Sequence, residues 1–457
     1  MLHRLTRIPR RRLRESVGRY ALALVVAVAI ALVAGLGGSW GTALGQTVPP
    51  PPAPAPPSPS AFPLPPLPGG ITLSGPTIVV IVPTGGGTVG TPLSFIFVTI
   101  PGTGGSISIV FTPVDPGSLG SSLGSNYLSA GILFGDGALL IQGLPGSLAM
   151  SRPAPPGFFQ AAAVEMVPLG QQRPFVAPLL LTYSPTPADM DKAGGNISRI
   201  VMGIFTDKGW LALPTSPDPA NGKITATVPF SGVVAAMIVP TTSGGSEVAL
   251  SNGRFFSESN GFGGVGGTGF TVTDDNSAAF WTEFQRLGGV PRVGYPVSGR
   301  FFHGGFITQT FQKMALQWRP ELGMAVPVNI FDDLNRRGDD SWLDTFREVP
   351  PAADTSPDTG LPFDAVVARH LSILVPYPPI LSAVQSDPNW EETFGLPLSV
   401  KDYGPMVGVR MQRATLQMWK VNVPWATAGT VIIGNGGDLA KEAGLWPVEA
   451  VVPLPLQ

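Results

Sequence analysis

Between residues 71 and 242, short apolar runs rich in β-branched and aromatic residues alternate with clusters of Gly and Pro. The clearest runs are Ile78–Val82, 93–100 and 106–111, and further strands are expected at 132–134, 138–141, 161–167 and 178–183. Such runs, bounded by turn-forming residues, are typical of β-strands. We therefore expect residues 71–242 to form a β-sandwich domain.

The spacing of the apolar positions becomes helical after residue 252. Four residues share one face of a predicted helix: Phe280, Trp281, Phe284 and Leu287. The acidic stretch 274–276 offers capping oxygens before this helix, and Gly288-Gly289 should end it, because glycine adopts the left-handed conformation at low cost. A hairpin is expected over 301–318, followed by a short helix over 330–337 that stops at Gly338.

This segment recurs about one hundred residues later along the chain. Phe311-Gln-Lys-Met-Ala-Leu-Gln reads against Met411-Gln-Arg-Ala-Thr-Leu-Gln, and Gly294-Tyr-Pro-Val-Ser reads against Gly395-Leu-Pro-Leu-Ser. Two separate patches with nearly the same offset indicate an internal repeat. Because one unit is too small to bury a full core, we expect the two units to pack together.

The N-terminal region has the pattern of an export signal. An Arg-rich start precedes an apolar run over 20–36 and a small-residue stretch that ends at Gln46, which is typical of a signal peptide. The run is also near the length needed to span a bilayer, so residues 1–46 are interpreted as a signal peptide or a membrane anchor. Residues 47–70 form a Pro-rich linker, and proline makes such a segment extended and semi-rigid.

The expected organisation is therefore a series of segments with different roles. After the signal and the Pro-rich linker come the β-sandwich at 71–242, a linker at 243–251, a two-unit repeat domain at 252–447 and a C-terminal tail at 448–457. The predicted fold class is mainly β with short helices (α+β).

The repeat domain resembles a known family of bacterial envelope modules. Trp281, Gly288-Gly289, Gly294-Tyr-Pro-Val-Ser and the run 316–321 (Leu-Gln-Trp-Arg-Pro-Glu) are similar to the LGFP-type repeat, in particular to its Chloroflexota-type two-unit form in secreted proteins. Asn260 and Gly261 depart from the Gly-His pair of that form, and Phe311-Gln-Lys-Met lacks its acid–Arg pair. The resemblance implies association with the cell envelope and a wall or polysaccharide ligand.

A second resemblance concerns residues 181–231. An Asp207-Lys208 turn, Trp210 and a Thr-rich strand over 223–231 are similar to the last part of a β-sandwich module of exported bacterial surface proteins. There the Asp-Lys turn is exposed and the Trp is buried. This resemblance implies a scaffold and no activity.

Composition limits the chemistry that the chain can perform. Cysteine is absent from the 457 residues, so disulfides, thiolate catalysis and Cys-ligated zinc are excluded. The formal net charge is −2, and much of the basic charge lies in the N-terminal signal. Since binding to phosphate backbones needs clustered Lys and Arg, nucleic acid is not an expected partner.

Candidate catalytic or metal-binding residues are few. His303 is interpreted as part of a solvated turn and His370 as a packed helix residue, and no pair of histidines has metal-ligand spacing. Asp332-Asp333 and Asp339-Asp340 are interpreted as helix caps rather than calcium ligands. For a glycosidase-type pair the candidates are Glu258, Glu283 and Glu321, although sequence cannot place two of them at the required separation.

Aromatic residues near predicted turns are the better candidates for a ligand surface. These candidate ligand-binding residues are Tyr295, Phe302, Phe306 and Trp425, whereas Trp281, Phe284, Phe311 and Trp318 are expected in the core. No catalytic, cofactor or metal residue is assigned, and no cofactor is expected.

The favoured interpretation is an exported, surface-tethered, non-enzymatic protein that binds or organises cell-envelope polysaccharide or wall polymer. It would be extracellular or at the cell surface, with the membrane as a second partner through residues 20–45. The alternatives are an exported hydrolase that acts on envelope glycan, with carboxylates of the second domain as catalysts, and a purely structural envelope component.

Overall fold

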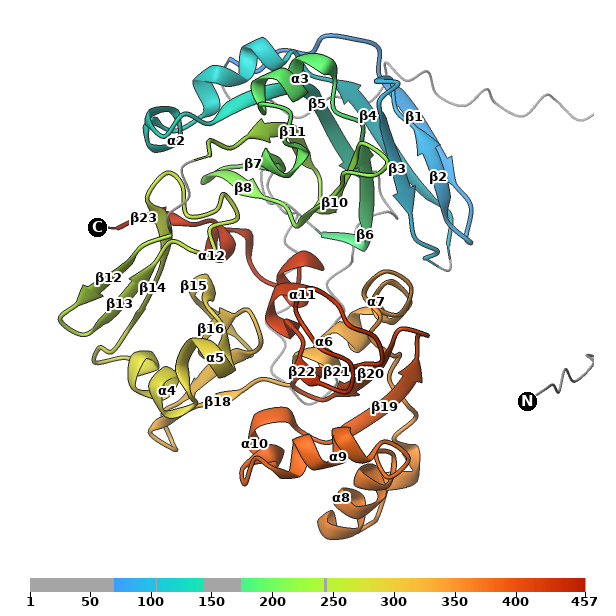
Figure 1. Ribbon diagram of the computed structural model, residues 1–457, viewed down its shortest axis with the longest axis vertical. Helices are drawn as coiled ribbons and strands as arrows, with labels where there is room; N and C mark the ends of the chain where they lie inside the picture. The colour runs from blue at the N-terminus through green and yellow to red at the C-terminus, as the bar shows by residue number, and fades with distance from the viewer. Residues whose placement is uncertain (1–69, 104, 144–173, 242–244, 457) are drawn as a thin grey trace, which may run out of the picture. The chain divides into compact units, whose positions relative to one another are not determined.

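The computed structural model describes residues 70–103, 105–143, 174–241 and 245–456. The predicted signal or anchor, almost all of the Pro-rich linker and the strand expected at 161–167 lie outside these ranges. The described residues belong to one compact unit. The described part of the chain is mainly β with short helices, as predicted (Figure 1).

Two antiparallel sheets form the β-sandwich. The six-stranded sheet has the order β1-β4-β5-β11-β7-β8, and the five-stranded sheet has the order β2-β3-β6-β10-β9. The strands are β1 (Ile78–Val82), β2 (Gly87–Gly90), β3 (Ile96–Ile100), β4 (Ile107–Pro113), β5 (Leu133–Gly143), β6 (Pro174–Tyr183), β7 (Ile200–Thr206), β8 (Gly209–Ala212), β9 (Thr215–Asp218), β10 (Lys223–Phe230) and β11 (Gly232–Ile238). Short helices connect them: η2 (Pro116–Ser122), α2 (Ser125–Ser129), α3 (Pro187–Lys192) and η3 (Ile197–Arg199).

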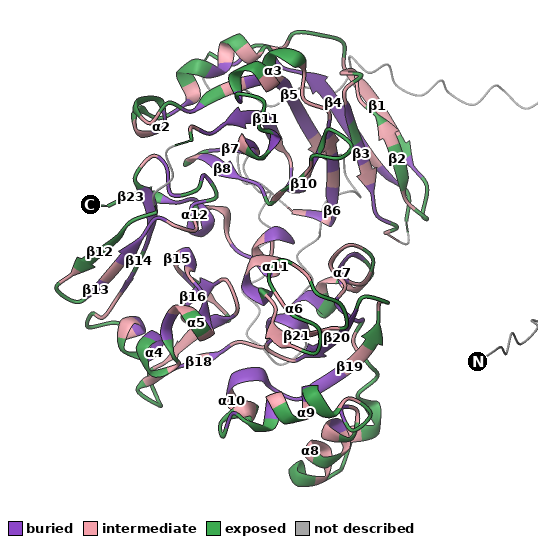
Figure 2. Cartoon of the chain, in the orientation of Figure 1, coloured by how far each residue is buried: buried purple, intermediate pink, exposed green. Residues whose placement is uncertain are grey.

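The core of the sandwich comes from alternate residues of both sheets. Ile109 and Ile141 of the first sheet and Leu181 and Val228 of the second belong to one buried cluster, and the central strands are largely buried in Figure 2. Trp210 is 1% exposed and lies behind the Asp207-Lys208 turn. A tryptophan of this size, nearly removed from water, contributes on the order of 2–3 kcal/mol of apolar burial.

One long strand, β5, replaces the two strands expected at 132–134 and 138–141. The sequence suggests a break because Gly135 and Gly137 lie between the two apolar runs. A Cβ at Gly135 would lie 2.6 Å from the Asp189 carboxylate, and one at Gly137 would lie 2.5 Å from the Tyr183 ring. These glycines therefore permit close packing within a continuous strand and do not form a turn.

A third antiparallel sheet has the order β12-β13-β14-β23. Its strands are β12 (Glu247–Leu250), β13 (Gly253–Phe256), β14 (Thr268–Thr273) and β23 (Leu454–Pro455). From the sequence, 247–250 is expected in a linker and 448–457 in a tail. In the structure, the first forms β12, and the second forms helix α12 (Val448–Val451) and strand β23, which pairs with β14. Backbone pairing between distant segments leaves little local signal in a sequence.

The two repeats form two four-stranded antiparallel sheets of the same order, β15-β16-β17-β18 and β19-β20-β21-β22. The first unit contains α4 (Phe280–Arg286), α5 (Gly289–Val293), β15 (Pro296–His303), β16 (Phe306–Phe311), β17 (Ala315–Arg319), β18 (Met324–Pro327), α6 (Ile330–Arg337) and α7 (Asp340–Arg347). The second contains η4 (Ser356–Asp358), α8 (Phe363–Ser372), α9 (Pro378–Gln385), α10 (Trp390–Phe394), β19 (Pro397–Asp402), β20 (Met406–Met411), β21 (Thr415–Trp419), β22 (Val431–Ile433) and α11 (Gly436–Glu442). The internal repeat is thus present in the fold.

Local sequence signals explain the helices that close each unit. Helix α6 covers the predicted residues Ile330–Arg337, with Asp332 and Asp333 in its first turn and two Arg in its last turn. Gly338 caps it in the left-handed conformation, with φ of 97°. Charges of these signs stabilise the two ends of a helix, and glycine accepts the left-handed cap without a steric penalty.

The turn that begins each sheet is the same down to its hydrogen bonds. Gln312 N donates to Tyr295 O at 2.9 Å, and Gln412 N donates to Leu396 O at 3.1 Å. The side-chain Oε1 of each glutamine accepts a second bond, from Tyr295 N at 3.1 Å and from Leu396 N at 2.9 Å. Both units therefore fix the start of their first strand with the same glutamine.

The closing helices are exchanged between the two units. Phe331 N at the start of α6 donates to Gln412 O of the second unit, at 3.3 Å. In the reciprocal contact, Asp438 N at the start of α11 donates to Gln312 O of the first unit, at 3.0 Å. Each unit thus completes the other, which explains why the repeat occurs as a pair.

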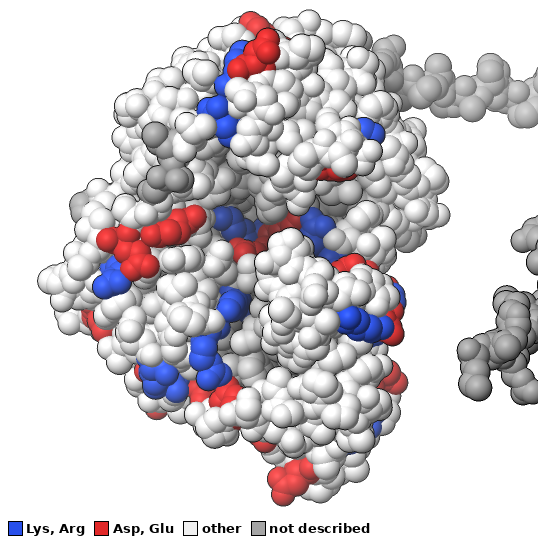
Figure 3. Space-filling model, in the orientation of Figure 1, with Lys and Arg blue, Asp and Glu red and all other residues white. Residues whose placement is uncertain are grey.

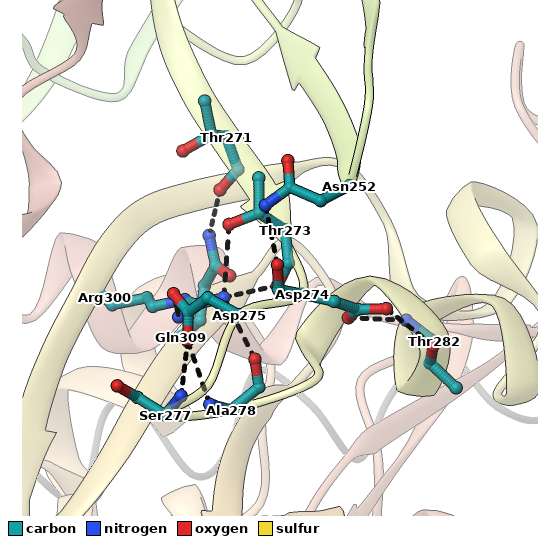
Figure 4. A network of polar contacts seen from close by, with 10 residues as sticks. All are labelled: Asn252, Thr271, Thr273, Asp274, Asp275, Ser277, Ala278, Thr282, Arg300 and Gln309. Atoms are coloured by element: carbon teal, nitrogen blue, oxygen red, sulfur yellow. Dashed lines mark hydrogen bonds and ion pairs between the residues drawn. The ribbon is translucent and has the colours of Figure 1, made fainter.

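A polar network joins the third sheet to the first unit (Figure 4). Arg300 Nη1 on β15 lies 2.6 Å from Asp275 Oδ2, and the guanidinium lies over the Phe280 ring at 5.1 Å. Gln309 Nε2 donates to Thr271 O on β14 at 2.8 Å. The N-cap residue of α4 is Ala279 and not a residue of the polar stretch 274–276, but Asp274 Oδ1 still accepts from Thr282 N in the first turn, at 3.0 Å.

A partly buried ion pair of the repeat region binds a threonine of the sandwich. Arg347 Nε on α7 lies 2.8 Å from Glu442 Oε2 on α11, and Arg347 Nη2 donates to Thr227 Oγ1 on β10 at 2.7 Å. Thr227 in turn donates to Glu442 Oε1 at 2.5 Å. Since all three side chains satisfy one another, this contact fixes how α7 and α11 pack on β10.

Within the described ranges, every helix is too short or too polar to cross a bilayer.

Candidate functional site

The four aromatic candidates occupy different environments. Phe302 is 75% exposed and Trp425 is 64% exposed. Tyr295 is half-buried and packs edge-on against Phe256, with ring centroids 5.8 Å apart. The Arg319 guanidinium covers the Phe306 ring at 4.3 Å. The structure therefore leaves Phe302 and Trp425 as the most accessible rings of the four.

Trp425 belongs to the second unit, in the loop between β21 and β22. Its ring meets Trp419 edge-on at 5.6 Å. Phe302 lies on β15 of the first unit, where it pairs with Ile307, and Phe306 on β16 pairs with His303, the neighbour of Phe302. The candidates therefore divide between the two units, with Phe302 and Phe306 on one hairpin.

Phe302 lines a cavity of about 450 Å³ between the sandwich and the first repeat. The other lining residues that matter chemically are Asp207, Phe230, His303, Trp446 and Glu449. The cavity thus combines apolar ring surfaces with two carboxylates and an imidazole. Its volume lies within the range of small-molecule sites, which is about 300–1,000 Å³.

His303 differs from the solvated turn residue expected from the sequence. Its Nε2 lies 2.9 Å from Asp333 Oδ2 on α6, and its ring meets Trp446 edge-on at 5.2 Å. Burial, with a further contribution from Arg336, lowers the pKa of His303 below its ordinary value. The side chain is held by α6 and Trp446 because the hairpin tip folds back against both.

Asp207, Trp446 and Glu449 were not singled out from the sequence as ligand residues. Asp207 was recognised only as part of an exposed turn, and Glu449 lies in the segment interpreted as a tail. The sequence separates these three residues widely from Phe302, so only the fold brings them to one cavity. The local feature that points to this segment in the sequence is the Trp446-Pro447 pair before α12.

A second cavity, of about 510 Å³, lies where α6 meets the second unit. Asp332 and Asn335 of α6 line one side, and Asp358, His370 and Gln412 line the other. Burial raises the pKa of Asp332 above its ordinary value. The hydrogen bond from His370, opposed by partial desolvation and aided by Arg369, lowers the pKa of Asp358.

His370 is 4% exposed, in agreement with its interpretation as a packed helix residue. Its Nδ1 lies 2.5 Å from Pro397 O, and its Nε2 lies 2.8 Å from Asp358 Oδ2. Because a carbonyl oxygen only accepts, Nδ1 must carry the hydrogen of that bond. The imidazole therefore ties α8 to the start of β19 and orients the Asp358 carboxylate at the cavity.

Two of the three glutamates considered for a glycosidase pair bind arginines, and the third, Glu258, has a buried Oε2 without a hydrogen-bond partner. Glu283 Oε2 accepts from Arg286 Nε at 2.8 Å within α4. Glu321 Oε1 accepts from Arg319 Nε at 2.6 Å on the surface. Glu258 lies near Tyr295 and contributes, after burial, to the raised pKa of that phenol. Nothing in these contacts brings two of them to one cleft.

The paired aspartates of α6 and α7 also have protein partners. Asp333 binds His303, Asp339 Oδ2 lies 2.6 Å from Arg337 Nε, and Asp340 Oδ1 lies 2.8 Å from Arg410 Nη1. Among the residues that the structure describes, no group of three or more metal-ligating side chains could hold an ion.

Much of the surface in Figure 3 is uncharged, and its charged side chains lie in a few groups.

Comparison with protein-family models and with curated proteins finds no match for this chain.

Proposed function

We propose that this chain is an exported, surface-tethered, non-enzymatic protein that binds or organises polysaccharide of the cell envelope. The LGFP-like character of its repeats and the signal-like N-terminus support this location. In this proposal, the N-terminal segment directs export or anchors the chain, and the Pro-rich linker holds the folded unit away from the membrane.

The observation that carries the proposal is the exposed ring of Phe302 at the mouth of the cavity with Trp446 and His303. An aromatic face can pack against the apolar C–H face of a sugar ring, and the nearby carboxylates and imidazole can bind its hydroxyls. Asp207 and Glu449 supply the carboxylates. We assign this cavity as the main polysaccharide contact.

Hydrolysis of envelope glycan is the alternative, and the contacts of the glutamates give it less support. A glycosidase needs two carboxyl groups that face the same bond, at separations of roughly 5–10 Å. Glu283 and Glu321 bind different arginines, and neither lines the cavity with Phe302, so a binding role accounts for the aromatic cavity with fewer assumptions.

Affinity electrophoresis in gels that contain solubilised envelope polysaccharide tests the proposal. The wild type is expected to be retarded, and Phe302→Ala is expected to weaken the apparent affinity at least tenfold. Ile81→Ala is the matched control, because Ile81 on β1 is also strongly exposed, at 73%, but lies outside the cavity. Equal retardation of the wild type and Phe302→Ala would refute the assignment of this cavity.

A further inference from the structure

The exchange of closing helices creates two equivalent positions in the repeat region. Asn329 and Asn435 precede α6 and α11, and the third residue after each is an aspartate, Asp332 or Asp438. Each helix begins over a glutamine of the other unit, Gln412 or Gln312. The two positions therefore present the same carboxylate on the same scaffold.

At the α11 position, a lysine accompanies the aspartate. Lys441 lies one helical turn after Asp438, and its amine lies over the Phe270 ring at 5.7 Å. Burial lowers the pKa of Lys441 to about 8, and burial raises the pKa of Asp438 to about 6, with each group partly offsetting the shift of the other. This position is thus occupied by the chain's own opposite charges.

At the α6 position, the equivalent of Lys441 is Asn335. Its Nδ2 donates to Asp340 Oδ2 at 2.9 Å, which directs the amide toward α7. Instead of a lysine, the cavity of about 510 Å³ adjoins Asp332 and Gln412 here. The same scaffold position therefore carries an aspartate–lysine pair in one unit and adjoins a cavity in the other.

The lining of the open position favours a neutral, hydroxyl-rich ligand. Two carboxylates line the cavity, and each has positive charge beside it: Asp358 pairs with Arg369, and Arg410 and Arg336 lie near enough to Asp332 to stabilise its charge. A carboxylate accepts several hydrogen bonds and an amide both donates and accepts, so together they suit neighbouring hydroxyls. Leu396 and Leu398 add an apolar surface, against which the C–H face of a sugar ring can pack.

We propose that the cavity between α6 and the second repeat is a second saccharide site, which binds one or more neutral sugar rings through Asp332, Asp358 and Gln412. The inference rests on the proposed function and deepens it, since two sites on one chain can engage one polymer together. Linked sites raise overall avidity without any new contact.

Isothermal titration of the purified protein with neutral trisaccharides tests the second site. The probes are chitotriose, maltotriose and xylotriose, with trigalacturonate as the charged comparison, and all are titrated into a Phe302→Ala background so that the first cavity contributes little. We expect at least one neutral probe to bind. Asn335→Lys, which copies the lysine of the α11 position, should weaken that binding at least tenfold.

Asp332→Asn provides a second variant in case Asn335→Lys disturbs folding, and it should weaken binding several-fold. Asp364→Asn is the matched control, since Asp364 is an exposed acid on α8 outside the cavity. Circular dichroism verifies the fold of each variant. The site is refuted if no neutral probe binds, if only trigalacturonate binds, or if a folded Asn335→Lys or Asp332→Asn protein binds as well as its parent.

Failure of this inference is distinguishable from failure of the proposed function. One set of results would remove only the second site. In that case envelope polysaccharide retards the wild type but not Phe302→Ala, and Asn335→Lys has no effect on trisaccharide binding. Absence of retardation in the wild type would remove the proposed function itself.

Discussion

A left-handed glycine opens the sheet of each repeat. Gly294 has φ of 85° and Gly395 has φ of 70°. A Cβ at Gly294 would lie 2.7 Å from the Cβ of Gln312, and one at Gly395 would lie 2.7 Å from the Cβ of Gln412. The glycine and the glutamine therefore act together: the first lets the chain turn, and the second fixes the turn with its amide.

Gly294→Ala should be more destabilising than the same change at Gly429. Both residues have φ of 85°, but nothing lies within 4 Å of a Cβ at Gly429. A left-handed alanine alone costs about 1–2 kcal/mol, and the steric clash at Gly294 should add roughly 1–3 kcal/mol. Guanidinium unfolding measures both variants, and equal losses of unfolding free energy would contradict the packing described for the turn.

The half-buried Asp438 should make stability depend on pH in the acidic range. Its pKa is raised from 3.8 to about 6 in the folded protein, so between about pH 4 and pH 6 the native state holds a proton that the unfolded chain has lost. The contribution of Asp438 to the free energy of unfolding should therefore be most favourable below pH 4 and should fall as pH rises through 6. Lys441 stays charged in both states in this window, because its folded pKa is about 8.

Asp438→Asn should reduce the fall in unfolding free energy between pH 4 and pH 6. Denaturant unfolding at pH 4, 5 and 6 gives the measurement, with the exposed Asp364→Asn as the control. If Asp438→Asn and the wild type show the same change across this range, the burial of the Asp438 carboxyl is not as described.

Residue-level chemistry was only partly predictable from the sequence. The accessibility of Phe302 and Trp425 follows from their places near turns, which the sequence shows. The cavity beside Phe302 does not, because Asp207, Trp446 and Glu449 reach it from distant segments. His303 lies at the hairpin tip as the sequence predicts, but its contacts with α6 and Trp446 were not predictable, because these partners are not its neighbours in sequence.

Among the secondary-structure elements, the exchanged closing helices distinguish this repeat pair from two independent modules. The start of α11 packs directly on the end of β16: a Cβ at Gly437 would lie 1.8 Å from Phe311 O. Gly436 is similarly close to Ile330 and Phe331 of α6, both at 3.1 Å. The Gly-Gly start of α11 is therefore required by the close approach of a backbone carbonyl.

Gly437→Ala should destabilise the repeat region by about 3 kcal/mol or more, because a backbone carbonyl cannot move aside as a flexible side chain can. Gly299→Ala on β15 is the control, since the nearest atom to its Cβ would be Ala450 O at 3.8 Å. Thermal unfolding checks both variants. A melting temperature of Gly437→Ala equal to that of the control would argue against the exchange of helices.

The secondary-structure elements were predicted well where their signals are local. Strand β1 and helix α6 have the predicted bounds, since an apolar run or a helix with its cap is encoded in consecutive residues. Strand β5 was divided because Gly135 and Gly137 look like turn residues, although they serve close packing against Asp189 and Tyr183. Strands β12 and β23 were missed because their pairing partners, rather than their own sequences, define them.

For the molecule as a whole, the contact of Arg347, Glu442 and Thr227 joins the sandwich to the repeats. The Glu442 side chain is 6% exposed and that of Arg347 is 25% exposed. The cavity beside Phe302 takes residues from both regions, so its shape depends on this contact.

Arg347→Met should weaken the docking of the two regions, because it leaves the Glu442 carboxylate buried without its cation. Removing one partner of a buried pair costs about 3–5 kcal/mol, and the partial exposure of Arg347 should reduce this to roughly 2–3 kcal/mol. Hydrogen exchange should show faster exchange in β10 and α11 than in the wild type. Lys208→Met is the control, because it removes only an exposed ion pair, with Asp207 at 3.9 Å, and should change hydrogen exchange little. Equal exchange rates in the two variants would contradict the role of Arg347.

The most direct test of the account is co-sedimentation of the purified protein with isolated cell envelope, combined with an assay for soluble sugar. We predict that the wild type is retained by the envelope, that Phe302→Ala is retained much less, and that no soluble sugar is released. Release of soluble sugar would identify a hydrolase in place of a binding protein. Failure of the wild type to sediment with envelope would contradict the central claim that this chain binds envelope polysaccharide.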